Sequence, residues 1–369
     1  MQRVTVGIVG NGNISPIYLK NLTTVFSRLV YVKGVCDLIP ERSQKAASDW
    51  NVPVIYETMY DMFQDPEIEI VLNLTTPKQH YGVAIEALRH GKHTHSEKPM
   101  AVERAHAKEL LDLANEKNLL IGVAPDTFMG AGIQTCRKLI DDGYIGRPIG
   151  AAAYMTGHGH ESWHPDPEFY YEEGGGPMLD MGPYYITALL NLLGPVERLT
   201  GVSRRMFDTR TITSPGKFGK VIPVEVDTHV TGIMEFANGA VGTIIMSFDM
   251  WQAEHPFIEV YGTEGTIQVP DPNGFGGPVR LSRGKGPFCE VPLTHAYAEN
   301  SRGIAVADMA CALRSGRKHR ASGELAFHAL DVMLGFGDSA RAGAHYKTVT
   351  TCERPAPLPT HLIEGFLDE

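Results

Sequence analysis

The chain opens with an apolar run that leads directly into a glycine turn. The run covers residues 4–9, and Gly10-Asn11-Gly12-Asn13-Ile14 follows it. A strand that ends in Gly-x-Gly and continues into a helix leaves backbone N–H groups and the positive end of the helix free to bind a pyrophosphate. The third position of this fingerprint is Ser15, where glycine or alanine is usual. The turn predicts a parallel α/β unit. It indicates either a dinucleotide site or a glycine that only turns the chain tightly.

Strands and helices continue to alternate up to about residue 123. A strand over residues 68–74 is broken by Thr75-Thr76-Pro77, and residues 93–96 lead into Glu97-Lys98-Pro99. Such alternation predicts a parallel sheet whose ligands bind at the carboxyl ends of the strands. Thr75, Pro77 and Lys98 lie at that edge of the predicted sheet.

An acidic residue follows the second strand. Asp37 comes after the apolar residues 29–36, close to the spacing of about 20 residues at which a carboxylate binds the adenosine ribose. A carboxylate there repels a 2′-phosphate, so Asp37 favours NAD over NADP, although Arg42 lies nearby. The alternative is that Asp37 only ends a strand.

Beyond residue 123 the pattern changes to strands followed by long helices. Runs over residues 228–236 and 240–248 flank Asn238-Gly239, which predicts a hairpin. The fold class is therefore α/β, a Rossmann domain, followed by an α+β domain with a large open, mainly antiparallel sheet. We predict a dinucleotide-binding domain at 1–122, a substrate-binding and oligomerisation domain at 123–342, and an extended C-terminal tail at 343–369.

Composition excludes several classes of partner. The formal net charge is −10 without a Lys/Arg-rich stripe, so nucleic acid and anionic membrane surfaces are not expected to bind. No apolar run approaches the ~20 residues that span a bilayer. The first strand starts too early for a signal peptide, and the five scattered cysteines include no CxxC pair. We expect a cytoplasmic protein.

Four motifs, taken in order, resemble the Gfo/Idh/MocA family of glucose–fructose oxidoreductase and inositol dehydrogenase. The similarity extends from residue 4 to about residue 342, and its motifs are Gly10-Asn11-Gly12-Asn13-Ile14, then Thr76-Pro77 with His80, then residues 87–93 running into Glu97-Lys98-Pro99, then Gly174-Gly175-Gly176 followed by Asp180-Met181-Gly182-Pro183-Tyr184. The resemblance implies an NAD cofactor, with NADP as the alternative, and a carbohydrate substrate. The predicted cofactor-binding residues are Gly10, Gly12, Asn13, Ile14, Asp37, Arg42, Thr75, Pro77, His80 and Glu97.

Three residues are the predicted catalytic groups. In the family that the chain resembles, the lysine of the Glu-Lys-Pro motif lies beside the nicotinamide and contacts the reacting sugar oxygen, with the aspartate nearby. Removing a hydride from an alcohol carbon also requires a base for the hydroxyl proton. Lys98 is the best candidate, because burial can bring a lysine pKa from ~10.4 to about 7–8. Asp180 would orient the hydroxyl or tune Lys98; a helix cap is its alternative role.

Tyr184 departs from the family pattern, since many relatives carry histidine there. Glucose–fructose oxidoreductase itself also carries tyrosine, so the change does not abolish redox chemistry. A tyrosine titrates near ~10 and is a neutral donor at pH 7. Our hypothesis is that Lys98 is the base and Tyr184 a hydrogen-bond donor to the same oxygen. A tyrosine that only packs in the core is the alternative.

The loop over residues 157–164 contains three histidines, a glutamate and a tryptophan. The spacing fits no compact metal site, so no metal is expected. We predict a sugar-binding loop in which His158, His160, Trp163 and His164 contact the substrate, with a plain surface loop as the alternative. Asp126, Asn300 and Arg302 are weaker substrate candidates.

The leading functional hypothesis is an NAD(P)-dependent oxidoreductase that acts on a CH–OH group of a sugar, polyol or glycoside. One alternative is a redox-neutral enzyme with tightly bound NAD that catalyses glycoside cleavage, elimination or epimerisation. Another is a sensor that binds NAD without catalysis. The uncovered face of the second sheet predicts a homodimer or homotetramer.

Overall fold

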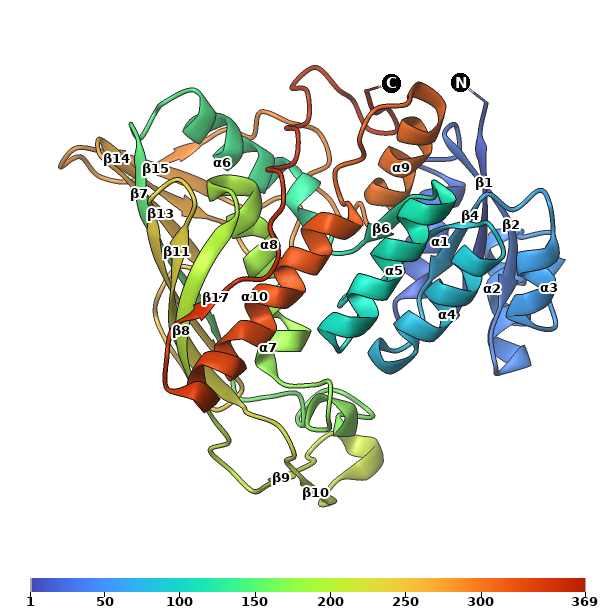
Figure 1. The fold of residues 1–369 in the computed structure, drawn as a ribbon, viewed down its shortest axis with the longest axis horizontal. Helices are drawn as coiled ribbons and strands as arrows, with labels where there is room; N and C mark the ends of the chain where they lie inside the picture. The colour runs from blue at the N-terminus through green and yellow to red at the C-terminus, as the bar shows by residue number, and fades with distance from the viewer. Residues whose placement is uncertain (1, 369) are drawn as a thin grey trace.

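The first part of the chain forms a six-stranded parallel sheet with helices packed against it (Figure 1). The computed structural model describes residues 2–368. The elements are β1 (Val4–Val9), α1 (Ser15–Thr23), β2 (Val30–Cys36), α2 (Pro40–Trp50), β3 (Val54–Ile55), α3 (Met59–Gln64), β4 (Ile70–Asn73), α4 (Pro77–Arg89), β5 (His93–Ser96), α5 (Arg104–Lys117) and β6 (Ile121–Val123). The strand order is β3-β2-β1-β4-β5-β6. Because the order reverses between β1 and β4, the carboxyl ends of these strands are where ligands of such sheets bind.

Burial in this sheet follows the sequence pattern. Ile70, Val71 and Leu72 are consecutive residues of β4, and all three are fully buried. A strand buried on both faces is typical of a parallel sheet covered by helices on each side. The predicted α/β domain is confirmed. Strand β6 still belongs to this sheet, and the predicted boundary after residue 122 falls within it.

The second part of the chain builds a nine-stranded sheet and its covering helices. The elements are η1 (Thr127–Met129), α6 (Ala131–Asp141), β7 (Pro148–Thr156), η2 (Glu168–Tyr170), α7 (Pro177–Asp180), α8 (Gly182–Leu193), β8 (Val196–Arg204), β9 (Thr209–Thr211), η3 (Pro215–Lys217), β10 (Val221–Pro223), β11 (His229–Phe236), β12 (Val241–Ser247), β13 (Ile258–Gly262), β14 (Gly265–Val269), β15 (Val279–Arg283), β16 (Cys289–Val291), α9 (Ile304–Ser315), α10 (Gly323–Ala342) and β17 (Tyr346–Lys347). The strand order is β16-β15-β14-β13-β7-β12-β11-β8-β17.

The large sheet is mainly antiparallel, as predicted, but it is not a simple meander. Strand β7 lies between β12 and β13 and pairs parallel to β12. The predicted hairpin is confirmed, since β11 and β12 pair antiparallel around a glycine with φ of +84° at position 239. Local turn chemistry predicts such a hairpin, whereas the insertion of a strand from about 90 residues earlier in the chain leaves no local signal.

Helices α6, α8 and α10 cover one face of the large sheet and separate it from the first domain (Figure 1). Helix α10 approaches strands β8 and β11 closely: a Cβ built at Gly201 or Gly232 would lie 2.7 or 2.5 Å from ring atoms of Phe336. Among residues 2–368, no helix covers the opposite face of the sheet (Figure 1). Ile233 follows Gly232, which faces Phe336, so its exposed side chain points to that opposite face. The predicted uncovered sheet face is therefore present.

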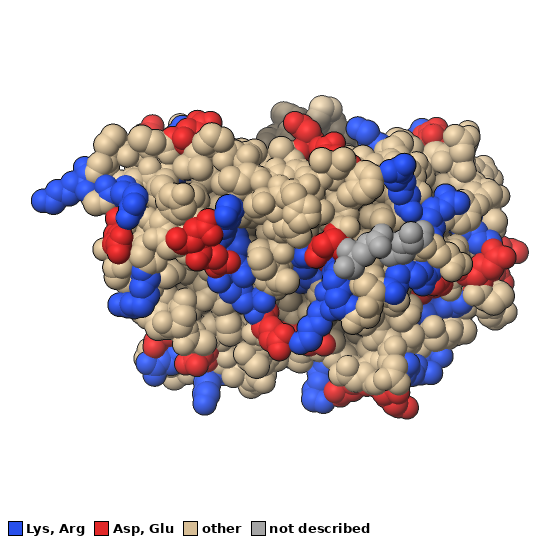
Figure 2. All heavy atoms as spheres, turned by 90° about the horizontal axis from the view of Figure 1, so that it is seen from above, with Lys and Arg blue, Asp and Glu red and all other residues tan. Residues whose placement is uncertain are grey.

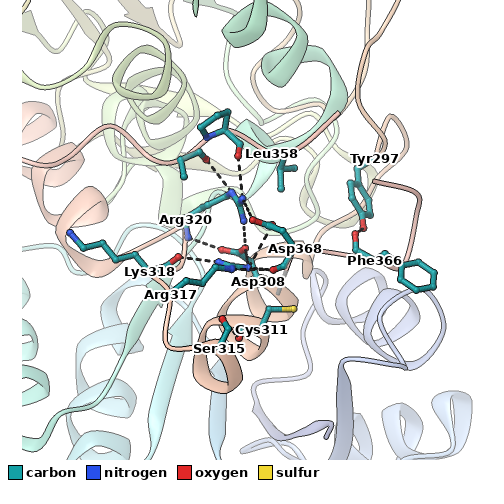
Figure 3. Close-up of polar contacts among 12 residues, drawn as sticks. Tyr297, Asp308, Cys311, Ser315, Arg317, Lys318, Arg320, Leu358, Phe366 and Asp368 are labelled. Atoms are coloured by element: carbon teal, nitrogen blue, oxygen red, sulfur yellow. Dashed lines mark hydrogen bonds and ion pairs between the residues drawn. The ribbon is translucent and has the colours of Figure 1, made fainter. Parts of the chain in front are cut away.

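The C-terminal tail has a buried anchor that the sequence pattern does not predict. Figure 3 shows Arg320 between Asp308 of α9 and Asp368 of the tail. The guanidinium of Arg320 lies 2.5 Å from Asp308 Oδ1 and 2.7 Å from Asp368 Oδ2, and its Nε donates to the Ala356 carbonyl at 3.0 Å. The extended tail is therefore held against α9 by a charge-assisted network.

Charge on the surface is mixed. Figure 2 shows Lys and Arg interspersed with Asp and Glu on the face viewed there, with no basic stripe on that face. Over residues 2–368, none of the helices combines the length and the apolar character that crossing a membrane requires.

Candidate active site

The glycine turn forms an open cradle at the end of β1. Gly10 has a φ of +94°, and a Cβ there would lie 2.8 Å from the backbone of Leu74 and Thr75. A Cβ at Gly12 would meet no atom within 4 Å, so the space over this residue is open. The Asn11 N–H donates to Asp37 Oδ2 at 2.6 Å, which ties the turn to the end of β2. An open turn before the first residues of α1 fits the pyrophosphate of a dinucleotide.

Replacing Gly10 tests this cradle. Gly10→Ala forces a side chain into the left-handed region and against a neighbouring strand end, a strain of about 1–3 kcal/mol. We expect the Kd for NADH to rise at least about tenfold, measured by fluorescence titration. Gly82→Ala is the matched control, because a Cβ at this helical position meets no atom within 4 Å. An unchanged Kd in Gly10→Ala would contradict the assignment.

His80 braces the ends of two strands. It is buried, its Nδ1 lies 2.7 Å from the Pro99 carbonyl and its Nε2 lies 3.0 Å from the Thr75 carbonyl. Burial lowers the pKa of His80, so the ring is neutral and donates to one carbonyl at a time. The Thr75 hydroxyl in turn donates to Asn73 Oδ1 at 2.6 Å. His80 therefore connects the segments that follow β4 and β5 at the predicted cofactor edge. Both of its ring nitrogens face backbone carbonyls.

Glu97 has a partner outside the predicted set. Tyr18 of α1 donates its hydroxyl proton to Glu97 Oε1 at 2.5 Å, and the Lys98 N–H donates to Oε2 at 3.1 Å. Burial and the Glu97 carboxylate raise the pKa of Tyr18 well above its usual value. The only sequence signal for Tyr18 is its position one turn after the start of α1. Of the other predicted cofactor residues, Asp37 is half-buried and Arg42 is exposed on α2.

The structure brings Lys98 and Asp180 together although 82 residues separate them. The Lys98 Nζ donates to Asp180 Oδ1 at 2.8 Å and to its carbonyl at 2.5 Å. Lys98 follows β5 of the first domain, and Asp180 ends the short helix α7 of the second. Both side chains are 15% exposed. The pair therefore joins the two domains at the carboxyl edge of the parallel sheet.

The charge state of Lys98 differs from the sequence expectation. Burial lowers the pKa of Lys98, but the Asp180 carboxylate and Tyr184 outweigh burial and raise it above its usual value. Burial raises the pKa of Asp180, while Lys98 and His160 lower it to about 2. Both groups are charged at neutral pH. Burial alone would bring the pKa of Lys98 down, but a buried carboxylate within hydrogen-bond distance has the larger effect.

Tyr184 lies beside this pair. Its side chain is buried at the start of α8, and the Lys98 Nζ lies 5.1 Å from the centre of its ring. Burial raises the pKa of Tyr184, and the cations of Lys98 and Arg302 oppose that rise. Arg302 is held by Asn273 Oδ1 at 2.6 Å and by Asn300 Oδ1 at 3.0 Å. Of the weaker candidates, Asn300 thus holds Arg302, and Arg302 in turn interacts with Tyr184.

Asp126, the third weaker candidate, has a structural contact. It is buried and accepts the Gly303 N–H at 2.7 Å, at the residue that precedes α9. Burial raises the pKa of Asp126 to about 6. Asp126 thus fixes the segment that carries Arg302.

The histidine-rich loop divides into two parts. His160 lies at the Lys98–Asp180 pair, with its Nε2 3.5 Å from Asp180 Oδ2. Trp163 and His164 come next in the loop, and their ring centres lie 5.4 Å apart. The Trp163 side chain is exposed. His158 points elsewhere: its Nε2 faces Arg210 at 3.2 Å, and its ring stacks on Trp251.

Arg210 is a residue that the sequence pattern did not reveal. It is buried on β9, where it pairs with Asp249 at 2.6 Å and lies 3.3 Å from Glu161. Through these contacts Arg210 holds the loop of residues 157–164 against β9 and against the segment that follows β12. Within residues 2–368, no group of three or more His, Cys, Asp or Glu side chains is arranged to hold a metal ion.

Comparisons with known proteins agree with this architecture. Residues 4–124 match the family model described as "Oxidoreductase family, NAD-binding Rossmann fold", and residues 133–268 match the GFO/IDH/MocA C-terminal domain. The chain is 25% identical over 291 residues to levoglucosan dehydrogenase of Pseudarthrobacter phenanthrenivorans, covering 72% of this chain and 73% of that one. It is 27% identical over 271 residues to scyllo-inositol 2-dehydrogenase (NAD(+)) of Bacillus subtilis, covering 72% and 74%.

A third relative matches over a shorter region. Inositol 2-dehydrogenase/D-chiro-inositol 3-dehydrogenase of Lactiplantibacillus plantarum is 34% identical over 148 residues, and the match spans 41% of its length. Among solved structures, levoglucosan dehydrogenase in complex with NADH superposes with a TM-score of 0.81 at 21% identity, covering 95% of this chain and 100% of that one. The predicted family resemblance is confirmed. The chain belongs to the GFO/IDH/MocA family of oxidoreductases, with an NAD-binding Rossmann fold in its first domain.

Proposed function

We propose that this protein is an NAD-dependent dehydrogenase that oxidises a CH–OH group of a sugar, polyol or glycoside. The contact between Lys98 and Asp180 carries the proposal, because it puts an ammonium and a carboxylate at the same carboxyl edge of the parallel sheet as the predicted dinucleotide cradle. The names of the relatives, levoglucosan and inositol dehydrogenases, support the substrate class. The net charge of −10 suits a neutral substrate.

Each residue of the site has a proposed role. Bound NAD supplies the hydride acceptor, and Gly10, Gly12, Asn13 and Ile14 would hold its pyrophosphate. Lys98 contacts the hydroxyl oxygen and, in its neutral form, accepts the hydroxyl proton, while the Asp180 carboxylate orients the amine. Tyr184 donates a hydrogen bond to the same oxygen. Trp163 and His164 lie farther out in the same loop and contact the part of a glycoside that extends away from the oxidised ring.

A substrate panel tests the proposed oxidation. Purified protein is incubated with NAD and neutral sugars, polyols and glycosides, and NADH formation is followed by absorbance. We expect NADH to accumulate with at least one member of the panel. A sugar product formed without NADH accumulation supports the redox-neutral alternative, and no product from any compound contradicts both.

The charge of Asp180 sets the pH dependence. The rate of oxidation should rise with pH, because the fraction of neutral Lys98 amine rises with pH. The Asp180 carboxylate raises the pKa of Lys98 and so moves this rise to higher pH. In Asp180→Asn the main charge that opposes burial is lost, and the pKa of Lys98 falls. We expect the acidic limb of the pH–kcat/KM profile to move to lower pH by about one unit or more. Asp112→Asn is the control, since the Asp112 side chain is 62% exposed on α5 and contacts Lys108. An unmoved limb in Asp180→Asn contradicts this role.

We also propose that the uncovered face of the large sheet forms a homo-oligomer interface. Ile233 lies on β11 at this face and is 48% exposed. Ile233→Asp puts a charge into a buried interface, so we expect a smaller particle in analytical ultracentrifugation. Val349→Asp is the control, since Val349 is 72% exposed and lies outside that sheet. An unchanged mass for Ile233→Asp, or a monomeric wild type, argues against this interface.

A cytoplasmic location stays a prediction from the scattered cysteines.

A further inference from the structure

A row of aromatic rings leads outward from Asp180. His160 is the first, with its Nε2 3.5 Å from Asp180 Oδ2. The ring of Tyr170 stacks on His160 at 3.8 Å between centres, and the ring of Trp163 lies 5.3 Å from His160. Phe169 lies 4.0 Å beyond Tyr170. We call His160, Tyr170, Trp163 and Phe169 the aromatic track.

Exposure increases along the track. The His160 side chain is 12% exposed, whereas Phe169 is 44% and Trp163 is 61% exposed. A single exposed aromatic residue needs no explanation. Here, however, the exposed rings are continuous with the buried Lys98–Asp180 pair. Ligand sites are lined mainly by aromatic and apolar side chains with a few polar groups placed among them.

Polar groups flank the aromatic track. Lys217 Nζ lies between Asp166 Oδ1 at 2.7 Å and Glu168 Oε1 at 2.6 Å. His164 accepts the Asp166 N–H at 3.0 Å through its Nδ1, and its ring lies 5.3 Å from Tyr170. A sugar ring presents flat C–H faces and a rim of hydroxyl groups. Aromatic rings flanked by charged donors and acceptors match both features.

We propose that the aromatic track binds a second sugar ring, so that the substrate of this site is a disaccharide or longer glycoside. The inference rests on the proposed oxidation at the Lys98–Asp180 pair and extends it to a substrate class. The oxidised ring lies against Asp180, and its glycosidic bond directs the next ring over Trp163. The position of His160 between Asp180 and Trp163 makes the two subsites adjacent.

A truncation of the tryptophan tests the second subsite. Wild type and Trp163→Ala are compared with cellobiose, maltose and lactose and with methyl glucoside and methyl galactoside. We expect wild type to prefer a disaccharide. In Trp163→Ala, kcat/KM for that disaccharide falls at least about tenfold, the effect of losing a central aromatic anchor, and kcat/KM for the methyl glycoside changes less than about twofold. Phe169→Ala has a smaller effect in the same direction.

Trp251→Ala is the matched control. Trp251 is 82% exposed, and its ring stacks on His158, which is not part of the aromatic track. We expect no change in either rate. Equal losses for disaccharide and methyl glycoside in Trp163→Ala, or a wild type that prefers the methyl glycoside, overturn the inference. A nitrophenyl glycoside preferred over every disaccharide also overturns it, because the track then binds an aromatic group.

A binding measurement separates this inference from the proposed function. Calorimetric titration of disaccharide into the protein with NADH should give a Kd that rises about tenfold in Trp163→Ala. If wild type binds the disaccharide in this way but oxidises no sugar, the proposed function fails and the subsite stands. If wild type oxidises methyl glycosides and Trp163→Ala binds disaccharides as tightly as wild type, only the subsite fails.

Discussion

Lys98→Met should lower kcat for sugar oxidation by about 10²–10⁴-fold, the range that general acid–base groups contribute. Methionine fills a similar volume but cannot hold the hydroxyl oxygen or move its proton. It also leaves the buried Asp180 without its cation. Binding of NADH should change much less than kcat, because the glycine turn is a separate part of the site. Steady-state kinetics and an NADH titration on one preparation give both values.

Two variants make the Lys98 result specific. Lys78→Met removes an exposed lysine that pairs with Glu172 at 3.4 Å, and it should leave kcat unchanged. Tyr184→Phe keeps the packing of α8 and removes the hydroxyl, so a smaller loss is expected. If Lys98→Met retained wild-type turnover and Tyr184→Phe lost it, Tyr184 would be the proton acceptor and the two proposed roles would be exchanged.

Arg320→Met should lower the free energy of unfolding by about 3 kcal/mol, the lower end of the range for breaking a buried ion pair. Asp308 is fully buried and would lose the Nη1 contact at 2.5 Å. It would keep Arg317 at 2.7 Å, which limits the loss. The Asp368 carboxylate loses its 2.7 Å contact and keeps only Arg317 at 3.8 Å, and the Ala356 carbonyl loses its donor. The tail should therefore become sensitive to protease in the folded protein.

An exposed ion pair in the same segment is the control for Arg320. Lys318 contacts Glu353 at 2.6 Å, but both side chains are at least 80% exposed. Lys318→Met should change the free energy of unfolding by less than about 1 kcal/mol. Denaturant unfolding with limited proteolysis distinguishes the variants. Equal stabilities for Arg320→Met and wild type would show that the tail anchor contributes nothing.

The first domain could be predicted well because its signals are local. The Gly10 turn, the strand ends and the Glu-Lys-Pro motif each lie within a few residues, and chain order then fixes a parallel sheet. The pairing of Lys98 with Asp180 has no such local signal. It came from the family motifs, and the structure supplies the distance.

Other features depend on contacts between distant segments. His158 and His160 are near neighbours with the same chemistry, yet only His160 reaches Asp180, because Arg210 of β9 holds His158. The raised pKa of Lys98 likewise comes from a neighbour 82 residues away. Periodicity and spacing report on one segment at a time, so they could not distinguish these cases.

A crystal structure with NADH and an oxidisable sugar tests the central claim most directly. The proposed chemistry predicts that the reacting hydroxyl oxygen lies about 2.6–3.2 Å from the Lys98 Nζ, within hydrogen-bond reach. The sugar carbon that carries it would face the nicotinamide. A sugar bound with every hydroxyl oxygen beyond hydrogen-bond reach of Lys98, or away from the carboxyl edge of the parallel sheet, would contradict the account.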